Sequence, residues 1–96
     1  MKLNKIERTP NEKKEFKATF TKPNGKTKIT RFGTASNFAL NKSKTEKDKK
    51  AYLARHKVNE NWNNPVSAGS LSKNILWGDS RSIKANTRDF KNKFNL

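Results

Sequence analysis

FKATFTKPNGKTKITRF, residues 16–32, has the pattern of a β-hairpin. Its first six residues alternate between an apolar and a polar side chain, which is the period of a strand with one buried face. Pro23-Asn24-Gly25 then gives a strong turn signal, and Thr27–Phe32 is rich in β-branched and aromatic residues. The sequence therefore predicts an antiparallel hairpin.

The register of this hairpin is open at the level of sequence. A loop of two residues would place Phe20 opposite Ile29, whereas a loop of three residues would place Phe16 opposite Phe32. A slip of one residue moves every side chain to the other face of the sheet, so the two registers predict different cores.

The segment before the hairpin has a different composition. Residues 1–14 carry five cations, two acids and a proline, with only two sizeable apolar residues after Met1. We predict a flexible basic arm, because such a segment buries too little apolar surface to offset the entropy lost on ordering.

The second half of the chain carries helix signals. Thr45 followed by Asp48 approximates a capping box, and good helix formers occupy residues 47–56. Asn64-Pro65 predicts the start of a second helix with proline in its first position, and Gly78 predicts its end.

A third helix is predicted near the C-terminus, with Ser80 or Ser82 as its N-cap. Its apolar face follows from residues that recur at helical spacing: Ile83, Thr87, Phe90 and Phe94. Upstream of the first helix, Phe38 and Leu40 lie in a segment that fits either a helical turn or a third short strand.

Length and composition allow one small domain. Leu, Ile, Val and Phe make up 18 of the 96 residues and are concentrated after residue 50, where Trp62 and Trp77 add large apolar area. We expect an α+β fold in which an N-terminal antiparallel hairpin (15–33) packs against two or three short helices (45–96), giving one domain over 15–96. No apolar run is long enough to span a membrane, and the chain contains no cysteine, so we expect a soluble intracellular or virion protein.

The net charge of +15 points to a polyanionic partner. A phosphate backbone binds scattered cations through counterion release, whereas a membrane surface usually requires a basic amphipathic helix or a lipid signal, and neither is obvious. Lysine also exceeds arginine by 18 to 5, and lysine is a point charge that does not read bases bidentately. We predict binding to nucleic acid, duplex DNA in preference to RNA, without strong sequence specificity; a merely solubilising surface is the alternative.

Eight cations of the helical half are the predicted nucleic-acid contacts. On the third helix they can line one edge while the phenylalanines face inward, although an ordinary amphipathic surface helix would have the same pattern. At the end of the first helix they stand close to Trp62, whose indole could stack on a base but is favoured as a core residue, as is Trp77. The set is Arg55, Lys57, Lys73, Arg81, Lys84, Arg88, Lys91 and Lys93.

Catalysis is not expected from this sequence. His56 is the only histidine, and Glu60 and Asp48 are the only acids near it in the sequence. A general base needs a partner, and a histidine metal site needs further ligands. We therefore predict no catalytic residue, no metal site and no cofactor.

The C-terminal half resembles a family of small basic proteins of unknown function that are encoded by large nucleocytoplasmic DNA viruses of eukaryotes (giant viruses). The residues that carry the resemblance are Tyr52-Leu53-Ala54-Arg55-His56, Trp62, Pro65, Ala68-Gly69, Leu71-Ser72, Ile75-Leu76-Trp77, Arg88-Asp89-Phe90 and Phe94-Asn95-Leu96. The resemblance implies a viral protein of the virion, the host nucleus or the cytoplasmic viral factory. It supplies no catalytic residues.

In such a virus a large genome must be neutralised, so genome packaging or a nucleoid role is the expected function. A minor capsid or internal virion protein that contacts acidic protein surfaces is the competing expectation, with other virion proteins as its partners. Binding measured at rising salt concentration separates the two.

Overall fold

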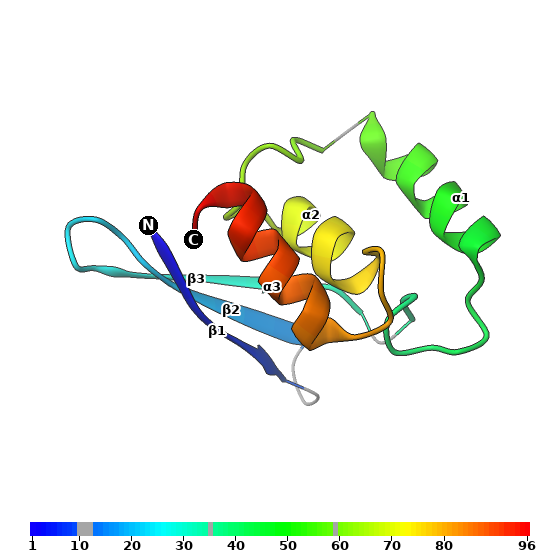
Figure 1. The fold of residues 1–96 in the computed structure, drawn as a ribbon, viewed down its shortest axis with the longest axis horizontal. Coiled ribbons are helices and arrows are strands. Elements are labelled where there is room, and N and C mark those ends of the chain that lie inside the picture. Colours follow the sequence, from blue (N-terminus) through cyan, green and yellow to red (C-terminus); the bar gives the residue numbers. More distant parts are fainter. Residues whose placement is uncertain (10–12, 35, 59) are drawn as a thin grey trace.

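A computed structural model gives the fold and describes residues 1–9, 13–34, 36–58 and 60–96. Strands come first and helices follow, as Figure 1 shows, which confirms the predicted α+β class and the N-terminal hairpin. The elements are β1 (Lys2–Arg8), β2 (Phe16–Thr21), β3 (Thr27–Phe32), α1 (Glu46–Lys57), α2 (Ala68–Leu71), the π-helical η1 (Ser72–Leu76) and α3 (Ile83–Phe94). Within the described residues, none of these helices is long and apolar enough to cross a membrane.

The three strands form one antiparallel sheet in the order β1-β2-β3. The helices α2, η1 and α3 lie together on one side of this sheet, and α1 stands apart from it beyond η1 (Figure 1). Phe16, Ala18 and Phe20 of β2 are buried, whereas the residues between them are half-buried. The alternation of apolar and polar side chains along β2 therefore corresponds to the face of the sheet that the helices cover and the face that they leave open.

The hairpin uses the three-residue loop. Phe16 lies opposite Phe32, with 5.7 Å between the ring centroids. The Gly25 amide donates to the Lys22 carbonyl at 2.9 Å, and Gly25 has φ +85. A turn followed by a left-handed residue matches the twist of the flanking strands, and glycine adopts that conformation without a steric penalty.

Residues 2–8 form a strand, so the prediction of a flexible arm is wrong for them. β1 pairs along β2, and Leu3, opposite Phe20, is 1% exposed. Ile6 also packs against the core. A strand at the edge of a sheet needs few apolar residues, because its partner supplies the backbone hydrogen bonds and one side chain in two faces the core. Residues 10–12 of the predicted arm lie outside the described residues.

The predicted capping box of α1 is confirmed. The Thr45 amide donates to Asp48 Oδ2 at 2.8 Å, and the Asp48 amide donates to Thr45 Oγ1 at 3.3 Å. The bond from the Thr45 amide is the main reason that the pKa of Asp48 is lowered. α1 has no buried residue. Its main anchor is Tyr52, which stacks on Trp77 with 4.3 Å between ring centroids.

The second helix does not begin at Pro65 as predicted. Asn64 Oδ1 accepts from the Val66 amide at 3.2 Å, and its carbonyl accepts from the Ser67 amide, so this segment forms a turn. Ser67 is the N-cap instead, and its hydroxyl accepts from the Ser70 amide at 3.1 Å. The side chains of Asn64 and Ser67 satisfy the local backbone better than an early helical turn would.

The core of the helical half comes from α2, η1 and α3. Leu71 of α2 and Ile75 and Leu76 of η1 are fully buried, and Phe90, on the predicted apolar face of α3, is 1% exposed. Trp77, which follows η1, is also buried. Ser82 is the N-cap of α3, because its hydroxyl accepts from the Ala85 amide at 3.1 Å. The predicted apolar face of α3 therefore packs into one core with η1 and the sheet.

The segment around Phe38 forms a single turn. The Asn41 amide donates to the Asn37 carbonyl at 2.9 Å, so the helical alternative holds for this one turn. The buried Asn37 side chain stabilises it by accepting from the Leu40 amide at 2.9 Å. Phe38 is thereby placed in the core, at 4% exposure.

Candidate nucleic-acid interface

One flank of α3 gathers three of the predicted contacts. Lys84, Arg88 and Lys91 stand at i, i+4 and i+7, so they lie along one side of the helix. Lys84 and Arg88 are exposed and Lys91 is half-buried, while Phe90 faces the core. Asp89 approaches Arg88 at 3.8 Å, but both side chains are mostly solvated, so the pair weakens the flank little.

The open face of the sheet adds cations that sequence reasoning missed. In the strand register, Lys17 of β2 lies between Glu7 of β1 and Arg31 of β3. Lys5 lies opposite Thr19 on the same face. The alternating side chains of β2 were the available signal, because polar positions of a half-buried strand share its outer face. The position of Lys5 was missed because the first residues were assigned to an arm.

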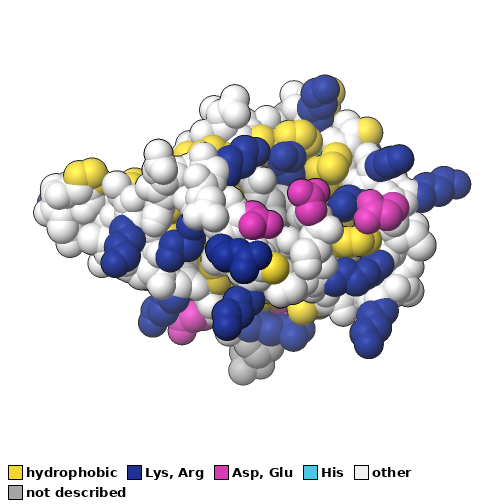
Figure 2. All heavy atoms as spheres, viewed as in Figure 1, with side chains coloured by type: hydrophobic (Ala, Val, Ile, Leu, Met, Phe, Trp, Pro, Cys, Tyr) yellow, Lys and Arg dark blue, Asp and Glu magenta, His cyan; other side chains and the backbone are white. Residues whose placement is uncertain are grey.

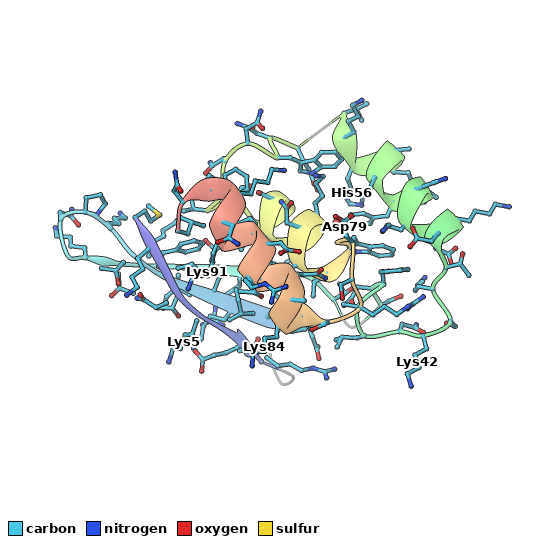
Figure 3. The ribbon with its side chains drawn as sticks, viewed as in Figure 1. Lys5, Lys42, His56, Asp79, Lys84 and Lys91 are labelled. Atoms are coloured by element: carbon cyan, nitrogen blue, oxygen red, sulfur yellow. The ribbon has the colours of Figure 1, made fainter. Side chains whose placement is uncertain are left out.

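Figure 3 shows Lys5, Lys84 and Lys91 on the side of the molecule that faces the reader. Figure 2 shows that Lys and Arg side chains clearly outnumber acids on this side. Glu7 is the only acid in the three strands, and it lies 3.4 Å from Lys5 Nζ and 3.7 Å from Lys17 Nζ. We call Lys5, Lys84, Arg88 and Lys91 the basic face, Arg88 belonging to it because it lies on the same flank of α3 as Lys84 and Lys91.

Lys93 and Lys73 belong to a different, mixed-charge environment. They line a pocket of about 240 Å³ together with Asp79 and Asp89. Burial lowers the pKa of Lys73, nearby Lys93 lowers it further, and Asp79 opposes them. Two acids within this pocket partly cancel its cations, so the structure does not join these lysines to the basic face.

Arg81, another predicted phosphate contact, makes several hydrogen bonds within the protein. Its guanidinium donates to the Phe38 carbonyl at 2.7 Å, to the Asn41 carbonyl at 3.1 Å and to the Lys44 carbonyl. It also lies over the Phe38 ring, 4.0 Å from the centroid. Three of its N–H donors bond to carbonyls of the segment before α1, a contact that the spacing of cations along the chain does not predict.

Arg55 and Lys57 are exposed on α1, as predicted, but α1 is set apart from α3 in Figure 1. They are therefore not part of the basic face. Arg55 lines a second pocket, of about 460 Å³, whose walls include Tyr52, His56 and Trp77.

Glu60 organises the aromatic residues near this second pocket. His56 Nδ1 lies 2.8 Å from Glu60 Oε1, and Trp62 Nε1 donates to Glu60 Oε2 at 2.8 Å. Trp62 is half-buried and carries Lys73 over its ring at 5.0 Å, so it lies at the edge of the core and Trp77 within it. Among the described residues, no three His, Cys, Asp or Glu side chains could together hold a metal ion.

Comparison with known proteins adds no relative. No protein-family model matches the chain, and no curated protein or solved structure is significantly similar to it.

Proposed function

We propose that the protein binds nucleic acid, duplex DNA in preference to RNA, through the basic face and without strong sequence specificity. The observation that carries the proposal is the position of Lys84, Arg88 and Lys91 on one flank of α3, on the same side of the molecule as Lys5. These cations come from two separate elements, β1 and α3, so they can reach several phosphates at once. Three of the four side chains are lysines, which neutralise phosphate without selecting a base.

The resemblance described above would place this activity in a large DNA virus, as genome neutralisation or packaging. The net charge of +15 supports such a role. DNA carries one negative charge per ~1.7 Å of duplex, so a strongly basic domain can coat it at high density. The competing role, a virion protein that binds acidic protein surfaces, predicts a different salt response and weak binding to DNA.

The test is binding to labelled duplexes of unrelated sequence, and to RNA, by electrophoretic shift or fluorescence anisotropy at rising salt. For about five to eight phosphate contacts, log K should fall with log salt with a slope of about −4 to −7. The triple variant Lys84→Ala, Arg88→Ala, Lys91→Ala should weaken binding at every sequence and make the slope shallower by about 2–3.

A matched control removes the same charge from another place. Lys42, Lys47 and Lys50 are exposed before and along α1. Their triple alanine variant should retain most of the affinity and most of the salt slope. Equal losses for both variants would show that only net charge matters and would contradict the basic face. Absence of a shift at ~50 mM salt would overturn nucleic-acid binding itself and favour an acidic protein partner.

A further inference from the structure

The second pocket has the size of a small-ligand site. At about 460 Å³ it falls within the range of ~300–1,000 Å³ that is typical for such sites. It lies where α1, the end of β3 and the start of α2 meet, so three separate parts of the chain build it. It shares no lining residue with the basic face.

A ladder of three rings forms one side of the pocket. Tyr52 lies between Trp77 and His56, with centroid separations of 4.3 Å and 4.1 Å. The Trp77 end of the ladder is buried in the core, whereas the His56 side chain is 40% exposed. The ladder therefore ends in a solvent-accessible aromatic ring, on which a further planar group can stack.

Glu60 fixes the orientation of that terminal ring. An ionised carboxylate only accepts hydrogen bonds, so His56 Nδ1 is the donor in its 2.8 Å contact with Glu60. The other carboxylate oxygen accepts from Trp62 at 2.8 Å. A Cβ at Gly69 would come within 2.7 Å of Glu60, so glycine leaves the space that this carboxylate occupies. Both carboxylate oxygens of Glu60 are thereby engaged by His56 and Trp62.

Cations outnumber acids in the remaining lining. Lys14, Lys44 and Arg55 come from three different segments, against the single carboxylate of Glu60. The hydroxyl groups of Ser36 and Ser72 are also part of the lining. A pocket with an aromatic platform, several cations and hydroxyl groups matches a ligand that is planar at one end and anionic at the other.

We propose that this pocket binds one nucleotide, with its base stacked on His56 and its phosphate among Lys14, Lys44 and Arg55. The nucleotide could be a free nucleoside monophosphate or the unpaired terminal nucleotide of a strand, since both carry the same base and phosphate. This inference stands beside the duplex-binding function and does not depend on the basic face.

The experiment is a titration of the ¹⁵N-labelled full chain, followed by amide chemical shifts, with the four ribonucleoside 5′-monophosphates. Adenosine and inorganic phosphate serve as the two half-ligands. At least one monophosphate should shift the amides of Arg55, His56 and Gly69 and bind about tenfold more tightly than either half-ligand. Stronger binding of a 5′-phosphorylated trinucleotide would identify a strand end as the source, and equal affinity would identify the free nucleotide.

Two substitutions at His56 separate stacking from structure. His56→Phe keeps a ring without the bond to Glu60 and should retain nucleotide affinity. His56→Gln keeps a donor for Glu60 without a ring and should lose about tenfold, the size expected for one lost base stack. Lys47→Ala, on the same helix but outside the pocket, is the control and should change nothing.

Several results would overturn the proposal. These are the absence of shifts around the pocket, phosphate binding as tightly as the monophosphates, and equal affinity of the His56→Gln and His56→Phe variants. Binding to duplex DNA is measured separately by electrophoretic mobility, and the His56→Gln variant should bind DNA with the affinity of the parent protein. Failure of the pocket and failure of the basic face are therefore distinguishable.

Discussion

Replacing Asn86 with alanine would test how far one buried amide holds the helical half together. Asn86 is 2% exposed. Its Nδ2 donates to the carbonyls of Ile75 at 2.9 Å and Ser80 at 2.6 Å, and its Oδ1 accepts from the Ser80 amide at 3.1 Å. One side chain thus joins η1, the turn after it and α3.

The expected cost of Asn86→Ala follows from these three bonds. Each contributes about 0.5–1.5 kcal/mol net, and the backbone groups of Ile75 and Ser80 are left without their partner in or near the core. Alanine favours the helix by roughly 0.5 kcal/mol more than asparagine, which offsets a small part. We expect a loss of about 2–4 kcal/mol, a large share of the roughly 5–14 kcal/mol typical for a chain of this length.

The assay is urea unfolding followed by circular dichroism at 222 nm. With a slope of about 2 kcal/mol per molar urea, the midpoint should fall by about 1–2 M. Asn92→Ala removes the same atoms from an exposed position of the same helix and should leave the midpoint nearly unchanged. A loss below about 1 kcal/mol for Asn86→Ala, or equal effects of the two variants, would refute the reasoning.

Two further predictions concern the sheet and the aromatic ladder. Leu3→Ala should lower the free energy of unfolding by about 2–5 kcal/mol in urea, since the side chain is 1% exposed and lies opposite Phe20. An unchanged urea midpoint would contradict the packing of β1 and favour the flexible arm that the sequence predicts. Tyr52 is the sole tyrosine, and burial, aided by the charge of Glu60, raises its pKa to about 12. Because this folded-state pKa lies above the ordinary 10.0, the stability from the neutral phenol is complete below about pH 10 and is lost as the pH rises through about 12. Phenolate absorbance near 295 nm should therefore titrate well above pH 10 in the folded protein and near 10 in urea, and identical midpoints would contradict the burial of Tyr52.

Local chemistry made the hairpin turn and the start of α1 predictable. The alternation along β2, the turn at Gly25 and the capping box at Thr45 each depend on neighbours within a few residues, and the structure confirms them. The predicted start of α2 was wrong because the chain offers two polar side chains that can cap a helix: Asn64 accepts from the Val66 amide in a turn, and Ser67 accepts from the Ser70 amide as the actual N-cap. Such competition is local too, but its outcome depends on small energy differences.

The candidate site was only partly predictable. The spacing of residues shows which cations share one side of a helix, but it does not show which cations of other elements lie near them. Lys84, Arg88 and Lys91 share a flank by helical geometry alone. Lys93, two residues beyond Lys91, lies near Lys73 and two acids instead. Lys5 reaches the basic face only because β1 pairs with β2, a contact between segments that the sequence does not relate.

The net charge, the hairpin turn, the helical spacing of the α3 flank and the fold class can be inferred from the amino-acid sequence, since each follows from composition or from interactions within one or two turns of chain. Four features emerge only when distant segments pack together: the three-residue register, the ordering of β1, the bonds of Arg81 to three carbonyls, and the ring ladder of Trp77, Tyr52 and His56. These features depend on groups far apart in the chain. Their free energy comes from burial and pairing that exist only once the sheet and helices have met.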